Sequence, residues 1–209
     1  MTKTYKVALL GFGNVNRALA QIIADDGADM AKRLGFELSI VAVSDLFLGS
    51  AYDGDGLDLR ALTALPAEKG ALSAIVGGRS GSNNEVFIKD TVADIVAEAT
   101  PTDSKTGEPA RTHCRWALEA GKHVVTSNKG PAALHSEELR AVALENRVQF
   151  GIEGTVMSGT PVLRMAKKQL KGCRISGFKG VLNGTANYIC LLYTSDAADE
   201  GLGVDLGGR

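Results

Sequence analysis

Short apolar runs alternate with helix-like segments through most of this chain, and that alternation most restricts its possible folds. Apolar runs of strand length occur at residues 5–10, 38–44, 95–99, 123–127 and 148–152. The segments after them repeat apolar residues at helical spacing, as Val15, Leu19 and Ile22 do after the first run. Strands that alternate with helices predict an α/β fold with a parallel, doubly wound sheet.

Length and charge restrict the partners of the chain. Its 209 residues are 44% hydrophobic and 22% charged, which is enough to bury a substantial core. The formal net charge of -1 gives no electrostatic attraction to nucleic acid or to an anionic membrane. No apolar stretch reaches roughly 18 residues, and Met1 leads into a strand without a signal-peptide core. We therefore expect a cytoplasmic protein with no nucleic-acid or membrane partner.

A glycine-containing turn separates the first apolar run from the first helical pattern. Gly11 permits a tight turn, and Gly13 lets the backbone approach a pyrophosphate at the amino end of the following helix. Asn16 stands where a third glycine is usual, so the motif departs from the full pattern. A chance glycine-rich turn is the alternative, but the position between strand and helix favours a Rossmann-type dinucleotide site.

Asp45 follows the second apolar run and has two possible roles. It could accept a hydrogen bond from the adenosine ribose of a dinucleotide, or it could cap its own loop. It lies roughly 30 residues beyond the turn rather than the usual interval of about 20, which a long first helix would explain. An acidic side chain here favours NAD, but the choice between NAD and NADP stays open.

Lys129 lies just past the carboxyl end of the apolar run at 123–127. Ligands of α/β sheets bind at the carboxyl ends of strands, and the glycine turn would lie at the same edge. A lysine in this position is often only a solvated loop residue. Its ammonium group also offers three hydrogen-bond donors, so a dinucleotide and this cation would meet if both motifs share a crevice.

Four segments in order resemble homoserine dehydrogenase from about Lys6 to Ile189. They read TPTD at 100–103, SNKGP at 127–131, EGTVMSGTP at 153–161 and GVLNGTANY at 180–188. The resemblance implies NAD(P)-dependent interconversion of L-homoserine and L-aspartate 4-semialdehyde, in the biosynthesis of threonine, methionine and isoleucine. It also implies that the parent protein is a homodimer.

The resemblance assigns roles to individual residues. The lysine that matches Lys129 contacts both coenzyme and substrate in the family, which makes Lys129 the candidate catalytic residue. Phe12, Asn14 and Val15 would line the path of the pyrophosphate and adenosine, together with Gly11, Gly13 and Asp45. Thr100 and Ser127 would touch the nicotinamide half.

A monovalent cation, sodium, is a further implication of the resemblance. In the family it is held through mainly backbone oxygens, at positions that match Glu153, Val156, Ser158 and Thr160. Clustered carbonyl oxygens suit a hard cation. The alternative is that Thr160 and Pro161 simply cap the next helix, and this does not exclude the cation.

We expect three segments. Residues 1–152 would form the dinucleotide-binding domain, and residues 153–189 would begin a second α+β domain for substrate binding and dimerisation, with a strand at 175–182. Residues 190–209 would be a non-native tail, because CLLYTSDAADE at 190–200 resembles a translated sequencing adapter. The family continues past this point to a second catalytic lysine, so we expect little turnover from the chain.

Two other functions are compatible with these motifs. One is a nicotinamide-dependent dehydrogenase that acts on another small amino-acid aldehyde. The other is a regulatory module that binds the nucleotide without catalysis. The fold alone would not distinguish them.

Overall fold

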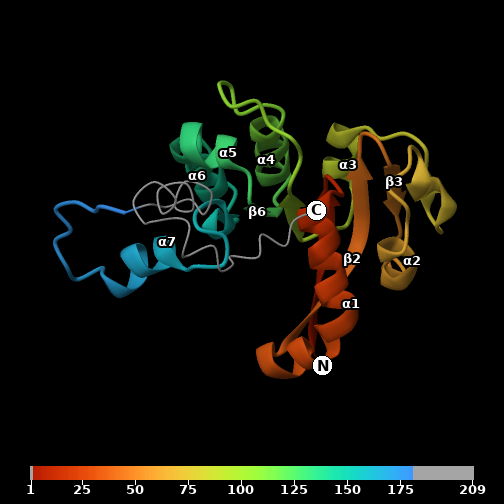
Figure 1. Cartoon of the computed structure of the whole chain (residues 1–209), viewed down its shortest axis with the longest axis horizontal. Coiled ribbons are helices and arrows are strands. Elements are labelled where there is room, and N and C mark those ends of the chain that lie inside the picture. The colour runs from red at the N-terminus through yellow and green to blue at the C-terminus, as the bar shows by residue number, and fades with distance from the viewer. Residues whose placement is uncertain (1, 181–209) are drawn as a thin grey trace, which may run out of the picture. The chain divides into compact units, whose positions relative to one another are not determined.

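The computed structural model describes residues 2–180, and its first part is built on a seven-stranded sheet (Figure 1). The strand order is β4-β3-β2-β1-β5-β6-β7. The strands are β1 (Lys3–Leu10), β2 (Phe36–Asp45), β3 (Gly49–Tyr52), β4 (Gly78–Arg79), β5 (Ile95–Glu98), β6 (His123–Thr126) and β7 (Phe150–Gly151). The pairs β1·β2, β1·β5, β5·β6 and β6·β7 are parallel, so five strands end at the same edge.

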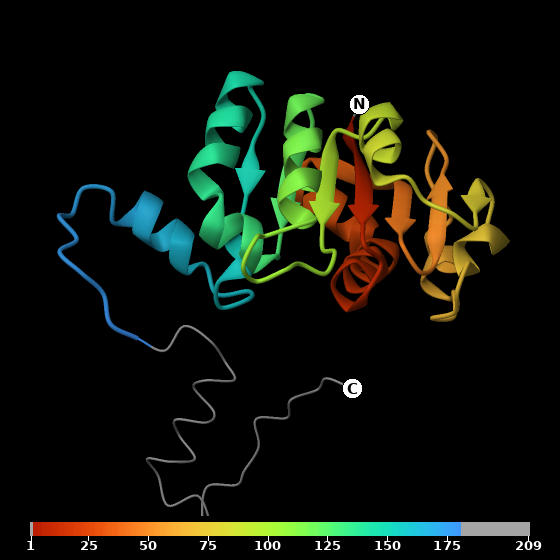
Figure 2. The same cartoon turned by 90° about the horizontal axis from the view of Figure 1, so that it is seen from above.

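Helices cover both faces of this sheet (Figure 2), which confirms the doubly wound α/β prediction. One face carries α1 (Asn14–Leu34), α2 (Leu59–Thr63) and the short 3-10 turn η1 (Ala71–Ala74). The other face carries α3 (Asn84–Asp90), α4 (Ala110–Glu119) and α6 (Ser136–Glu145). A further short helix, α5 (Lys129–Leu134), joins β6 to α6.

The sequence of β1 shows why both faces are buried. Val7 and Leu9 pack into the apolar cluster beneath α1 and α2, whereas Ala8 and Leu10 pack into the cluster beneath α3, α4 and α6. All four side chains are at most 4% exposed. Successive strand residues point to opposite faces, so a continuous apolar run is needed where both faces are covered.

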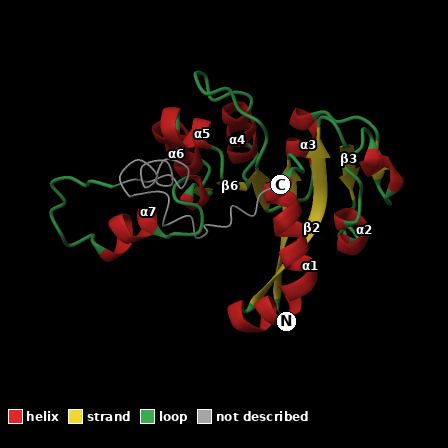
Figure 3. Cartoon of the chain, in the orientation of Figure 1, coloured by secondary structure: helices red, strands yellow, loops and turns green. Residues whose placement is uncertain are grey.

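The sheet is parallel except at one edge, which the sequence did not predict. β3 pairs antiparallel with β2, and β4 pairs antiparallel with β3, in segments where the sequence analysis predicted no strand (Figure 3). These strands span four and two residues, too few for an alternating pattern to be visible. Gly77 permits the approach, because it has φ of +75° and any Cβ there would collide with the carbonyl oxygen of Tyr52.

The chain divides into two compact units, one ending at Thr155 and the other beginning at Val156. The first unit ends with the 3-10 turn η2 (Glu153–Thr155). The second contains α7 (Val162–Arg164) and the π-helical turn η3 (Met165–Gln169). Residues 175–180 form no strand, contrary to expectation, and the rest of that predicted strand lies outside the described residues. The predicted tail at 190–209 also lies outside them.

Among the helices of residues 2–180, none combines the length and the apolar character that crossing a membrane would require.

We expect Gly27→Ala to stabilise the first unit. Gly27 lies inside α1, and a Cβ there would meet only Ile23, at 3.7 Å. Alanine should raise the free energy of unfolding by about 1 kcal/mol, because glycine loses more backbone entropy in a helix. Urea unfolding measures the change. Gly77→Ala is the matched control and should destabilise; stabilisation by both substitutions, or by neither, would contradict this account.

Candidate functional site

The glycine turn lies between the carboxyl ends of β2 and β5. The N–H of Gly11 donates to the carbonyl of Ser44 at 2.8 Å. Gly11 has φ of +77°, and a Cβ there would lie 2.7 Å from the carbonyl oxygen of Ala99. Gly13 has open space where its side chain would be, with nothing within 4 Å. The turn is therefore packed on one side and open on the other, as an approach to a ligand requires.

Asn16 takes the place of the third glycine and fastens the turn. Its side chain is 2% exposed, and its amide nitrogen donates to the carbonyl oxygens of Leu10, Gly11 and Ala97 at 3.2, 2.7 and 3.1 Å. The sequence analysis treated Asn16 as a defect in the motif. The structure shows instead that the amide satisfies backbone carbonyls of β1, the turn and β5.

The amino end of α1 is suited to an anion. The helix has 21 residues, begins at Asn14 and has neither a side-chain cap nor an acidic residue in its first turn. Asn14 and Val15 are exposed, so no side chain competes with a ligand for the first N–H groups of the helix.

Phe12 differs from expectation in one respect. Its ring is 2% exposed and lies in the core, with the guanidinium of Arg17 4.7 Å from the ring centre, so it does not line the surface of the turn.

Asp45 caps two loops. One carboxylate oxygen accepts from the N–H of Phe12 at 2.9 Å, and the other accepts from the N–H groups of Phe47 and Leu48 at 2.8 and 3.0 Å. The capping role that the sequence analysis considered is therefore present. These contacts also place the carboxylate directly beside the glycine turn, where the ribose role stays a prediction.

Val15 and Lys129 line one pocket of about 420 Å³ at the carboxyl edge of the sheet. It is bounded by the first turn of α1, the loop after β5 and the start of α5. Its lining includes Val15, Ala99, Thr100, Ser127, Asn128 and Lys129. The glycine-turn helix and the lysine therefore share a crevice, as the sequence predicted. A larger groove of about 710 Å³ runs along β3, β4 and α3, but none of the predicted site residues lines it.

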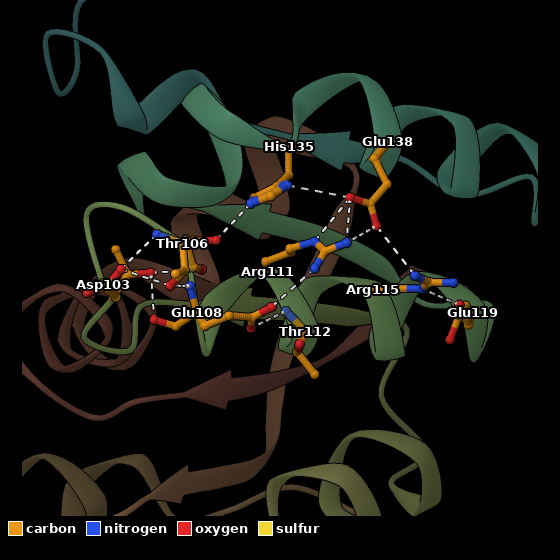
Figure 4. Close-up of polar contacts among 11 residues, drawn as sticks. Asp103, Thr106, Glu108, Arg111, Thr112, Arg115, Glu119, His135 and Glu138 are labelled. Carbon is orange, nitrogen blue, oxygen red and sulfur yellow. Dashed lines mark hydrogen bonds and ion pairs between the residues drawn. The ribbon is translucent and has the colours of Figure 1, made fainter.

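The loop after β5 forms one wall of this pocket, and polar contacts fasten it (Figure 4). The Asp103 carboxylate accepts from the hydroxyl and N–H of Thr106 and from the N–H of Lys105, and these bonds lower the pKa of Asp103. His135 lies 2.8 Å from the carbonyl oxygen of Thr106. Beside it, Arg111 donates to both carboxylate oxygens of Glu138, at 2.8 and 2.9 Å, and so ties α4 to α6.

His113 is a buried polar residue behind the pocket, and the sequence analysis gave it no role. Its two ring nitrogens lie 3.4 Å from the hydroxyl of Thr100 and 3.1 Å from the side-chain amide of Asn84. Burial lowers the pKa of His113 from 6.5 to about 4, so the ring is neutral at pH 7.

Comparison with known proteins decides the family. Residues 11–153 match the family model for the NAD binding domain of homoserine dehydrogenase. The chain belongs to the homoserine dehydrogenase family. A second model, described as homoserine dehydrogenase, matches residues 161–201. That match extends beyond residue 189, where we expected native sequence to end.

Named homoserine dehydrogenases align with nearly the whole chain. The NAD(+)-dependent homoserine dehydrogenase of Pseudomonas canavaninivorans is 58% identical over 185 residues, covering 88% of this chain and 53% of the relative. That of Methanocaldococcus jannaschii is 37% identical over 194 residues, covering 92% and 57%. A hyperthermophilic archaeal homoserine dehydrogenase solved in complex with NADPH has a TM-score of 0.65 and 29% identity, covering 78% and 47%. The chain thus spans about half the length of the curated relatives that it matches.

The four positions that the sequence analysis assigned to a cation fall in different units. Glu153 begins η2 in the first unit. Val156, Ser158 and Thr160 belong to the second, where Ser158 has φ of +49° and the carbonyl of Thr160 accepts from Val162 at 2.8 Å. The capping alternative is not what is observed, because Pro161 itself occupies the position before α7 and no side chain caps that helix. The cation site stays a prediction from the resemblance.

We expect acid to destabilise the fold through His113. With a pKa of about 4 when folded and 6.5 when unfolded, the imidazole takes up its proton first in the unfolded state. Stability is therefore complete above pH 6.5 and falls as the pH drops toward 4, by about 2 kcal/mol between pH 7 and pH 5. His113→Gln keeps polar atoms but cannot titrate, so it should remove this part of the dependence. Urea unfolding at both pH values measures it; the same pH dependence in both proteins would refute the assignment.

Proposed function

We propose that the crevice between the glycine turn and Lys129 binds a nicotinamide dinucleotide. We further propose that the protein interconverts L-homoserine and L-aspartate 4-semialdehyde, in the biosynthesis of threonine, methionine and isoleucine. The observation that carries the proposal is the shared pocket, which joins Val15 of α1 to Lys129 of α5. Membership of the homoserine dehydrogenase family supports the choice of reaction.

The residues of the turn fit the dinucleotide. The open side of Gly13 and the uncapped amino end of α1 suit the pyrophosphate, whose charge the free N–H groups and the helix dipole stabilise. Thr100 and Ser127 line the same pocket as Val15, and in this proposal they contact the nicotinamide half. No acidic side chain lines this pocket among the described residues, so its lining does not repel an anion.

Lys129 is the group that we propose acts on the substrate. The bound nicotinamide supplies or accepts the hydride. Lys129 is exposed at the first position of α5, and its ammonium donates to the substrate oxygen, which gains negative charge as the carbonyl is reduced. The ammonium can bridge this oxygen to the coenzyme because it has three donors.

Asp45 bears on the choice of coenzyme, and we propose that NAD is preferred. Its carboxylate lies at the end of β2, beside the N–H of Phe12, where the adenosine ribose would come. A ribose hydroxyl can donate to this carboxylate, whereas a 2′-phosphate would be repelled. The Pseudomonas canavaninivorans relative is named for NAD(+), whereas the archaeal structure is a complex with NADPH, so family membership alone does not decide the coenzyme.

Three further proposals rest on the resemblance. A sodium ion would be bound by backbone oxygens at Glu153, Val156, Ser158 and Thr160. The parent protein would be a homodimer that works in the cytoplasm. Residues 153–189 would belong to the substrate and dimerisation domain, and residues 190–209 would be non-native.

We expect Lys129→Ala to weaken NADH binding by the 209-residue chain by about tenfold or more, because a charge-assisted hydrogen bond contributes roughly 1.5–3 kcal/mol. Titration of NADH fluorescence measures the affinity. Lys69→Ala is the matched control, since Lys69 is also an exposed lysine but does not line the pocket. No NADH binding by the unchanged chain, or equal effects of the two substitutions, would contradict the proposal.

The substrate needs a second measurement on the same variants. The 209-residue chain should turn over homoserine poorly, whereas residues 1–189 joined to the C-terminal part of the Pseudomonas canavaninivorans relative should reduce NAD with homoserine. Lys129→Ala in this fusion should lower kcat/KM by about 100-fold. Turnover only with another amino-acid aldehyde would favour a different dehydrogenase, and binding without any turnover would favour a regulatory module.

We expect Asp45→Ser to shift coenzyme preference toward NADPH by about tenfold, because it removes a negative charge beside the ribose. The substitution also breaks the cap on Phe12, Phe47 and Leu48, which should lower stability and weaken both coenzymes. The measured quantity is therefore the ratio of NADH to NADPH affinity in the same folded sample. An unchanged ratio would show that Asp45 is only a cap.

A further inference from the structure

Glu98, the last residue of β5, is a buried carboxylate directly behind the pocket. It is 1% exposed. One oxygen accepts from the N–H of Thr100 at 2.8 Å and from its hydroxyl at 2.6 Å. The other oxygen accepts from the hydroxyl of Thr126 at 2.8 Å. The side-chain amide of Asn128 lies 3.5 Å from the first oxygen. We call Glu98, Thr100, Thr126 and Asn128 the Glu98 network.

The Glu98 network joins the two loops that form the pocket. The side-chain amide of Asn128 donates to the carbonyl of Thr100 at 2.6 Å, and the N–H of Asn128 donates to the hydroxyl of Thr126 at 2.9 Å. Thr100 begins the loop after β5, and Asn128 directly precedes Lys129. The carboxylate of Glu98 therefore fixes the backbone of both loops that line the crevice. On one side the fixed residue is Asn128, the neighbour of Lys129 in the sequence.

A second chain of contacts extends the network toward β2. The hydroxyl hydrogen of Thr100 is directed to Glu98, so the oxygen of Thr100 accepts from Nδ1 of His113, 3.4 Å away. Nε2 of His113 then accepts from the amide of Asn84 at 3.1 Å. The oxygen of Asn84 accepts from the hydroxyl of Ser44 at 2.7 Å. In this series of hydrogen bonds every donor hydrogen is directed toward Glu98. The carboxylate therefore sets the orientation of each group in the series.

We propose that Glu98 is a positioning residue for the coenzyme and for Lys129. It acts through Thr100, Thr126 and Asn128 and touches neither coenzyme nor substrate. The inference rests on the proposed function, since it assigns Glu98 a part in the same crevice. Its chemical basis is that a carboxylate only accepts hydrogen bonds, and the groups around it all donate.

Substitution by glutamine tests this chemistry with little change in shape. In Glu98→Gln the NH₂ group faces either the donors of Thr100, which breaks those bonds, or the hydroxyl of Thr126, which must then accept instead of donate. In both orientations the negative charge that strengthens these bonds is lost. Thr126→Val removes the hydroxyl that donates to Glu98 from the other loop. Thr126→Ser keeps this hydroxyl and should behave like the unchanged chain. Leu62→Ala is the control for lost stability, because Leu62 is fully buried in α2, in the cluster on the opposite face from α4.

The first measurement is residue-resolved hydrogen exchange without coenzyme. The amides of Thr100 and Asn128 should exchange at least about tenfold faster in Glu98→Gln and in Thr126→Val, since the hydrogen bonds that protect them are weakened, lost or displaced. They should stay protected in Thr126→Ser and in Leu62→Ala. Equal exchange of these two amides in Glu98→Gln and in the Leu62→Ala control would overturn the proposal.

The second measurement is NADH affinity in a double-substitution cycle. Glu98→Gln should weaken binding by about tenfold, and Lys129→Ala should then cost less than it does in the unchanged chain, because the lysine is already misplaced. Additive effects of the two substitutions on NADH affinity would overturn the proposal. So would an NADH affinity of Glu98→Gln equal to that of Leu62→Ala. Failure of the unchanged chain to bind NADH would contradict the proposed function instead. Hydrogen exchange would then still show whether Glu98 holds the two loops in place.

Discussion

The parallel pairing of β1, β5 and β6 is the constraint on which the site depends. Leu10 is paired with Glu98, and Glu98 is paired with Thr126, so the three strands end at the same level of one edge. The glycine turn, the loop after β5 and the segment before Lys129 must therefore emerge side by side. Residues that are more than a hundred positions apart in the chain line one pocket for this reason.

Hydrogen bonds beneath that edge hold the glycine turn and the two neighbouring loops in fixed positions. Asn16 fastens the glycine turn to β5, Asp45 holds the turn against β2, and Glu98 ties β5 to β6. Burial of a carboxylate is costly unless donors surround it, and Glu98 has such donors. Within the described residues, every buried side-chain nitrogen and oxygen has a hydrogen-bond partner. Such a fully satisfied polar layer favours one arrangement of the loops over looser alternatives.

The sequence predicted the parallel core of the fold and the pocket shared by Lys129 and the helix after the glycine turn, because long apolar runs and turn residues are local signals. It missed β3 and β4, whose two to four residues are too few to show a period. It also predicted a strand at 175–182, and residues 175–180, the described part of that segment, form none. It also missed Asn16 and Glu98. Their partners, such as Ala97 for Asn16 and Thr126 for Glu98, are distant in sequence, so only the folded chain reveals them.

The most direct test of the central claim is hydrogen exchange of the 209-residue chain with and without saturating NADH. If one crevice binds the coenzyme, amides at 11–16, 99–104 and 127–130 should gain protection together. The groove along β3, β4 and α3 should not change. Protection of only one of the three loops, or of the residues that line that groove, would contradict the account.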